Sequence, residues 1–160
     1  MKVVVFDFDK TLTYIDSGFL FCICNLMKPH YLLRYLFHRE AFVHSYERKK
    51  NYYGLPKAIL KLNIRNRMLA HLKFFLDGDY KVILLTGSCH YTINDYSGLL
   101  PLAQFDKIYT LEDFLAINAP SLLDGKLKIL EQYPLIYYFV NDNPKEINSI
   151  TNRTQHWLRV

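Results

Sequence analysis

The sequence predicts an α/β domain, in which a parallel β-sheet is covered by helices on both faces. Short apolar runs recur along the chain, and most of them end in polar residues. Segments with helical periodicity separate these runs, and strands that alternate with helices are typical of parallel sheets. The chain has 160 residues, of which 51% are hydrophobic and 22% charged, which suits one domain with its own core.

The apolar runs define the predicted strands. The first, residues 2–8, is continuous and β-branched, as expected of a parallel strand buried on both faces. Further strands are predicted over 80–85, 107–109 and 135–140, with 156–160 closing one edge of the sheet. Helices are predicted over 66–76, 91–100 and 126–132, and from Pro144, with Asn143 as its cap. Together these elements predict a three-layer, Rossmann-like core.

Residues 17–63 do not fit this alternation. They are rich in Leu, Phe, Tyr, Arg and His, and they are interrupted at Pro29 and at residues 54–56. We interpret this segment as a small α-helical cap that is inserted after the first strand. The core then comprises residues 1–16 and 64–160.

The positive charge is concentrated in and next to the predicted cap. Residues 28–67 contain ten Lys or Arg and two Glu, a net charge of +8, although the whole chain carries +5. The remainder is therefore slightly acidic, at −3. If the basic segment is functional, it attracts an anionic substrate or a lipid surface, and peripheral membrane contact follows; the alternative is an ordinary solvated face.

The cysteines and apolar segments predict a cytoplasmic protein without a membrane span. Cys22, Cys24 and Cys89 are an odd number, and their spacing forms no disulfide framework. The apolar stretch 19–26 is too short to cross a bilayer. The N-terminal run reaches Asp7 too early to form the apolar stretch of a signal peptide.

Polar residues gather where the predicted strands end. Asp7 and Asp9 follow the first strand, Thr86 and Ser88 the second, and Asp142 the fourth. In open parallel sheets, ligands bind beyond the carboxyl ends of the strands. These side chains therefore predict a binding site at that edge.

Asp7 and Asp9 form a carboxylate pair at the first of these strand ends. Two carboxylates in one cleft repel each other, so the pKa of one rises while a bound cation keeps the other ionised. Covalent phosphoryl transfer needs this division between an anionic nucleophile and a proton carrier. The alternative is a turn with an Asp cap.

Three segments resemble motifs of the haloacid dehalogenase-like (HAD) superfamily. The run VVVFDFDKTLT resembles its first motif, KVILLTGS its second, and IYYFVNDNPKE its last. Their order and spacing match along nearly the whole chain. The insertion after the first motif resembles the helical cap of the phosphoserine-phosphatase-like branch, some of whose members act on lipid phosphates.

The resemblance implies a role for each matched residue. Asp7 would attack phosphorus and become an aspartyl phosphate, while Asp9 would protonate the leaving oxygen and later activate water. Thr86 and the Gly87 amide would hold phosphate oxygens. Mg²⁺ would be bound by Asp7, Asp142 and the backbone carbonyl of Asp9, which suits a hard cation that has few protein ligands.

Two further assignments come with alternatives. The family places a lysine near the nucleophile, and Lys126 fits that position better than Lys128, although either could be a solvated helix lysine. Asp16 lies where related enzymes contact substrate, but it could equally cap a helix.

Three residues depart from the family pattern. Lys10 replaces the usual Gly of the first motif, so the loop is stiffer or directs a charge into the cleft. Asn141 stands where Gly or Ser is common. Glu146 replaces an Asp, and it would reach the metal through water.

The resulting expectation is a Mg²⁺-dependent phosphatase that hydrolyses the phosphate monoester of a small metabolite or a lipid. One alternative is a catalytically weak or inactive HAD-like protein that binds an anionic partner. No nucleic acid is expected as a partner. Another alternative is a response-regulator receiver, but its phosphorylated Asp would follow the third strand, where this chain has none in that role. The sequence assigns neither the substrate nor an oligomeric state.

Overall fold

The structure of the protein is a computed structural model that describes residues 1–24, 33, 37 and 55–160. Most of the predicted cap lies outside these residues. Within its range the structure shows helix α1 (Ser17–Cys24) and helix α4 (Lys57–Asn63). The division of the chain into core and cap therefore stays a prediction.

The predicted α/β class is confirmed by a five-stranded parallel sheet. Its order is β3-β2-β1-β4-β5. The strands are β1 (Lys2–Phe6), β2 (Tyr80–Leu85), β3 (Lys107–Tyr109), β4 (Ile136–Asn141) and β5 (Thr154–Arg159). All five predicted strands are present, and β5 begins two residues earlier than expected.

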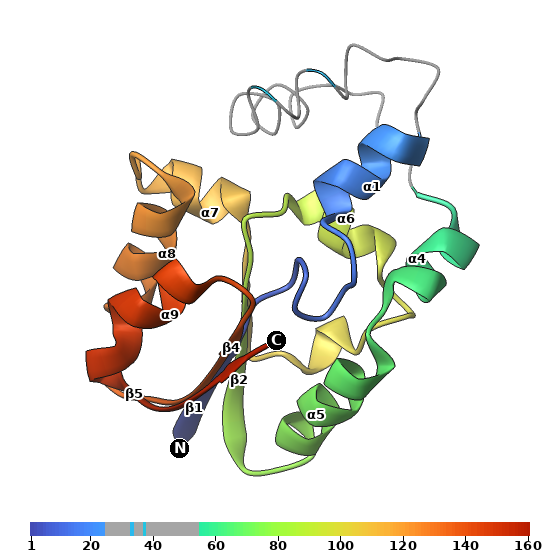
Figure 1. Ribbon diagram of the computed structural model, residues 1–160. Coiled ribbons are helices and arrows are strands. Elements are labelled where there is room, and N and C mark those ends of the chain that lie inside the picture. The colour runs from blue at the N-terminus through green and yellow to red at the C-terminus, as the bar shows by residue number, and fades with distance from the viewer. Residues whose placement is uncertain (25–32, 34–36, 38–54) are drawn as a thin grey trace.

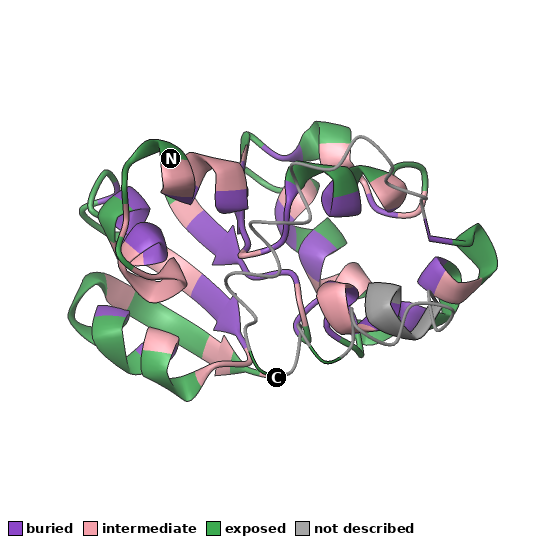
Figure 2. Ribbon diagram, turned by 90° about the horizontal axis from the view of Figure 1, so that it is seen from above, coloured by how far each residue is buried: buried purple, intermediate pink, exposed green. Residues whose placement is uncertain are grey.

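Helices cover both faces of the sheet (Figure 1). Those on one face are α1, α4, α5 (Asn66–Leu76) and α6 (His90–Asp95), and those on the other are α7 (Leu111–Ala116), α8 (Leu122–Leu130) and α9 (Pro144–Ile150). Strand alternation divides the core in two: Val4 and Phe6 pack with the first group, and Val5 packs with the second. Seen from above, the buried residues follow the central strands and the helix faces that meet them (Figure 2).

The helix boundaries differ from the prediction in three places. Helix α6 ends at Asp95 because the chain turns there, with Gly98 at a φ of +79°. Helix α8 begins four residues early, where the Ser121 hydroxyl accepts a hydrogen bond from the Asp124 amide. Helix α7 was not predicted; a capping box of Thr110 and Asp113 starts it, and its six residues are too few for a periodic pattern. The Asn143 cap before Pro144 is confirmed, because the Asn143 side chain accepts from the Lys145 amide.

The strand order creates a switch point beside β1. From β1 the chain moves outward to β2 and β3, and then returns to the other side of β1 to form β4 and β5. Phe6 pairs with Leu84 on one side and with Val140 on the other. The polar residues after β1, β2 and β4 therefore meet at one edge, where open α/β sheets bind ligands.

No helix in the described part of the chain is both long enough and apolar enough to cross a bilayer.

Gly125 allows α8 to pack closely against α7. A Cβ atom at this position would lie 2.7 Å from the Phe114 Cβ, which is closer than real contacts allow. The neighbouring residue, Lys126, is also buried, and its partners are Asp7 and Glu146. Any larger residue at position 125 therefore has to push the two helices apart.

We predict that Gly125→Ala destabilises the protein. Overpacking costs about 1–3 kcal/mol, while the gain in helix propensity is about 1 kcal/mol, so a net loss of roughly 1 kcal/mol is expected. Chemical denaturation measures it, with Lys128→Ala, an exposed position on the same helix, as the control. An unfolding free energy equal to that of the control would contradict close packing at Gly125.

Candidate functional site

Asp7 is buried at the carboxyl end of the central strand. Its amide donates to the Val140 carbonyl at 2.9 Å, which continues the hydrogen bonding between β1 and β4. The Lys126 Nζ lies 2.8 Å from Asp7 Oδ1 and 2.8 Å from Glu146 Oε2. One buried ammonium group therefore joins carboxylates from β1 and α9.

Helix α8 selects which lysine reaches Asp7. Gly125, Lys126 and Ile129 lie on its buried face, while Lys128 is exposed. The structure thus brings Lys126 to Asp7 and leaves Lys128 in solvent.

Burial dominates the electrostatics of Asp7 and Lys126. Desolvation raises the pKa of Asp7 from 3.8 to about 7; Lys126 opposes this change, and Glu146 and Asp9 add to it. Burial alone would lower the pKa of Lys126, but Asp7 and Glu146 raise it above its ordinary value. Lys126 is therefore charged at neutral pH, whereas Asp7 is divided between its two forms.

Asp9 is held by two serines that are far apart in sequence. Its Oδ1 accepts from the Ser17 amide at 2.7 Å, and its Oδ2 accepts a short hydrogen bond from the Ser88 hydroxyl. The two serine hydroxyls lie 2.7 Å apart. Burial and then the charge of Asp16 raise the pKa of Asp9, while the serine hydrogen bonds lower it. This environment favours a carboxyl group that can carry a proton.

Thr86 and Gly87 follow β2 at the same edge. Thr86 is fully buried; its amide donates to the Tyr109 carbonyl at 3.0 Å and its hydroxyl oxygen accepts from the Ser88 amide at 3.0 Å. Gly87 is half-buried in the bend before α6. The contact of either residue with phosphate stays a prediction.

Asn141 and Glu146 are linked at the end of β4. The Asn141 side chain is buried; its amide nitrogen donates to Glu146 Oε2 at 2.6 Å, and its oxygen accepts from the Asn143 amide at 2.7 Å. Glu146 is therefore engaged with Asn141 and Lys126, and its contact with a metal through water stays a prediction. Burial raises the pKa of the half-buried Asp142; Lys10 opposes this, and Glu146 adds to it.

Asp16 caps helix α1. Its Oδ1 accepts from the amides of Gly18 at 3.0 Å and Phe19 at 3.1 Å, which otherwise lack helical partners. Of the two roles expected for Asp16, the structure shows the helix cap, and its contact with substrate stays a prediction.

The charges of this edge fit a divalent cation. Among the described residues, no three His, Cys, Asp or Glu side chains are grouped so that they could hold a metal alone. Mg²⁺, however, is commonly bound by one or two carboxylates with waters and phosphate, so Asp7, Asp142 and a backbone carbonyl would suffice. Burial raises the pKa of both carboxyl groups, so a bound cation would favour their ionised forms. The donor chemistry and the charge therefore fit Mg²⁺.

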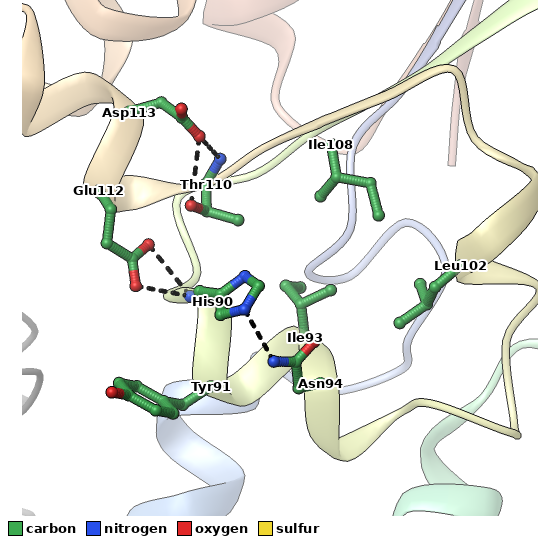
Figure 3. Close-up of a pocket in the computed structure, with 9 residues that line it drawn as sticks. All are labelled: His90, Tyr91, Ile93, Asn94, Leu102, Ile108, Thr110, Glu112 and Asp113. Atoms are coloured by element: carbon green, nitrogen blue, oxygen red, sulfur yellow. Dashed lines mark hydrogen bonds between the residues drawn. The ribbon is translucent and has the colours of Figure 1, made fainter. Parts of the chain in front are cut away.

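A separate pocket lies next to this edge, between α6 and α7 (Figure 3). Its volume is about 590 Å³. The His90 amide donates to both Glu112 oxygens, at 2.8 and 3.0 Å, and the Thr110 amide and hydroxyl both donate to Asp113. Because carboxylates dominate its polar lining, this pocket does not suit phosphate.

Comparison with protein-family models and with curated proteins finds no match. Among solved structures, the chain is similar to the HAD domain of effector protein Lem4 from Legionella pneumophila. The TM-score is 0.48 and the identity 14%, over 99% of this chain and 84% of that chain. A likeness of this degree carries no argument about function.

The residues that hold Asp9 and Glu146 were not predicted from the sequence motifs. Ser17 and Ser88 bind Asp9, and Asn141 binds Glu146. Ser88 stood among the polar residues at the strand ends, but no pattern in the sequence paired it with Asp9, 79 residues away. Only the fold brings these groups together.

Lys10 adopts a left-handed backbone conformation in the loop after Asp9. Its φ is +59°. The amides of Thr11, Leu12 and Thr13 all donate to the Phe8 carbonyl, at 3.2, 2.9 and 3.3 Å, which forces a tight turn. This conformation explains why Gly suits the position, and Lys10 brings a positive charge near Asp142 as well.

We predict that Lys10→Gly is more stable than Lys10→Ala. Both variants lose the same charge, but a left-handed conformation costs a non-Gly residue roughly 1–2 kcal/mol, part of which the flexibility of unfolded Gly offsets. The expected difference is about 1 kcal/mol in the free energy of unfolding. Denaturation curves of equal midpoint would contradict the strained turn.

Proposed function

We propose that this chain is a Mg²⁺-dependent phosphatase that hydrolyses a phosphate monoester through an aspartyl phosphate at Asp7. The observation that carries the proposal is the buried Asp7 at the switch point of the sheet, with the Lys126 ammonium at 2.8 Å. A buried carboxylate that is paired with a cation at a ligand-binding edge is a candidate for catalysis.

In the first step a carboxylate oxygen of Asp7 attacks phosphorus. The bond from phosphorus to the ester oxygen breaks, and the leaving oxygen takes a proton from Asp9. Lys126 holds Asp7 in place and stabilises negative charge on the transferring phosphoryl group.

In the second step water attacks the same phosphorus. Asp9, now ionised, accepts the proton of the water, the bond from Asp7 to phosphorus breaks, and inorganic phosphate leaves. Ser17 and Ser88 keep the Asp9 carboxylate in one orientation for both proton transfers. The raised pKa of Asp9 suits its role as the acid in the first step.

Asp7, Asp142 and the Asp9 carbonyl are the groups that would hold Mg²⁺. Bound there, Mg²⁺ would offset the repulsion between the Asp7 anion and the phosphate anion, about 4 kcal/mol per charge pair at ~4 Å and an effective dielectric of 20. Thr86 and the Gly87 amide would bind phosphate oxygens, and Asp16 would approach the substrate from the start of α1. The substrate class stays a small metabolite or lipid phosphate, because most of the cap lies outside the described residues.

We predict that Asp7→Asn abolishes phosphatase activity. The amide cannot form the acyl phosphate, so turnover of phosphate esters should fall by at least about a thousandfold. A panel of phosphate esters assayed with Mg²⁺ and with a chelator measures the loss. Asp77→Asn, at an exposed carboxylate after α5, is the control and should keep full activity.

Two results would contradict this assignment. Substantial turnover by Asp7→Asn would exclude the nucleophilic role, and activity that survives the chelator would exclude the metal. If the intact protein hydrolyses no ester of the panel, the alternative of a HAD-like binding module for an anionic partner takes its place.

The raised pKa of Asp7 predicts a link between pH, Mg²⁺ and stability. Between pH 3.8 and about 7 the folded protein retains a proton that the unfolded chain has released. The contribution of Asp7 to stability is therefore complete below pH 3.8 and declines as the pH rises to about 7. Mg²⁺ favours the ionised carboxylate and should reverse this decline.

We expect the thermal midpoint to rise more with Mg²⁺ at pH 8 than at pH 5. Thermal unfolding with 10-fold steps of MgCl₂ at both pH values measures the increase. In Asp7→Asn the difference between the two pH values should shrink. An equal effect of Mg²⁺ on wild type and variant would show that the ion binds elsewhere.

A further inference from the structure

A second concave surface lies between α5 and the strands β4 and β5. Its volume is about 870 Å³. Helix α5 contributes Arg67, His71 and Phe74, whose spacing places them on one face of the helix. The strand side includes Tyr138 and Leu158. We call this surface the α5 groove.

Two buried nitrogen atoms of residues that line the α5 groove have no hydrogen-bond partner among the described residues. They are the Arg65 Nε and the His71 Nε2. Buried donors without partners are rare, since each costs about 1–3 kcal/mol. The Arg65 guanidinium lies 5.5 Å from the centre of the Tyr14 ring, at one end of the groove. An anion bound beside this ring would pair with the guanidinium through its terminal nitrogen atoms, because the Nε itself is closed to solvent.

The α5 groove is cationic. Arg65 and Arg67 line it, and none of the described residues in its lining carries a carboxylate side chain. Arg159 also contributes, but strand alternation turns its side chain away from the face that carries Leu158. Burial and the charge of Arg67 lower the pKa of His71, which favours the neutral imidazole. The two arginines therefore supply the positive charge, and the neutral His71 ring has one nitrogen atom free to form a hydrogen bond.

The rest of the groove is apolar and partly exposed. Met68 is buried at its base, Tyr138 and Leu158 are half-buried, and Phe74 is 65% exposed. His71 packs against the Tyr138 ring, with 5.6 Å between centroids. An anion that also carries an aromatic or aliphatic body would cover these side chains and bury apolar surface.

We propose that the α5 groove binds a small organic anion. Arg65 and Arg67 would hold its phosphate or carboxylate group, as guanidinium groups do in bidentate pairs, and its apolar body would rest on Phe74, Tyr138 and Leu158. Arg65 also donates its backbone amide to the Leu12 carbonyl at 2.9 Å, so the groove borders the loop after β1. The proposal does not depend on phosphatase activity at Asp7.

The test follows the Arg65 side chain during a titration with phenylphosphonate, which resists hydrolysis, in the presence of a chelator. In ¹H–¹⁵N spectra of the full chain, the Arg65 Nε–H resonance should move saturably as the anion pairs with the guanidinium group. Benzoate should move the same resonance. Whichever of phenylphosphonate and benzoate binds more tightly identifies the preferred anionic group. Inorganic phosphate lacks the apolar body and benzyl alcohol lacks the anionic group, so both should bind more weakly than phenylphosphonate.

Matched variants distinguish specific binding in the α5 groove from non-specific attraction to positive charge. Arg65→Gln and Arg67→Gln should each weaken phenylphosphonate binding about tenfold or more, as calorimetry measures it. Lys73→Gln removes the same charge from an exposed position of α5 outside the groove, and should change the affinity less than twofold. Arg67 is exposed, so its variant should fold even if Arg65→Gln does not.

Three results would overturn the proposal. The Arg65 resonance could stay unmoved at saturation. Lys73→Gln could weaken binding as much as Arg67→Gln, which would show non-specific attraction. Benzyl alcohol could bind as tightly as phenylphosphonate, which would show an apolar pocket without anion recognition.

Discussion

The buried ammonium of Lys126 is the interaction on which the arrangement of the candidate site depends. It joins α8 to Asp7 at the end of β1 and to Glu146 on α9, with both distances at 2.8 Å. A charge removed from water is stable only with partners, so the three elements must keep one geometry. Gly125, the residue before Lys126, lets α8 approach α7 closely. The close packing of α8 on α7 and the position of the Lys126 ammonium group therefore both depend on where α8 lies.

This constraint leaves an unequal balance of charge at the sheet edge. The groups that act on one another there include five carboxyl groups and two ammonium groups: Asp7, Asp9, Asp16, Asp142, Glu146, Lys10 and Lys126. With all of them ionised, three negative charges remain without compensation. Burial is the largest cause of the raised pKa of Asp7, Asp9 and Asp142, and neighbouring carboxylates add to it. A doubly charged cation would offset most of the excess charge, and a proton on Asp9 would offset part of it.

The sequence predicted the three central strands well because they are buried and continuous. Strands β1, β2 and β4 each read as an apolar run, and the polar residue after the run marks its end. Strand β5 is mostly exposed, and it begins two residues before its predicted start. Helix α7 escaped prediction because a helix of six residues has too little periodicity; only its capping box, Thr110 and Asp113, signals it. The contacts of Ser17 and Ser88 with Asp9 were not predicted for another reason. These contacts join residues 8 and 79 positions apart, and local patterns hold no information about such pairs.

The two proposed binding sites take ligands of opposite charge, and both border the loop after β1. At the switch point, β1 and β4 end side by side, which gathers carboxylates over the edge of the sheet. On the α5 face, Arg65 follows α4 and leads into α5, and its backbone is tied to the loop that carries Asp9. The same loop therefore lies between the proposed Mg²⁺ site and the proposed anion groove. A ligand bound beside Arg65 and Tyr14 would contact residues that belong to this loop or are tied to it.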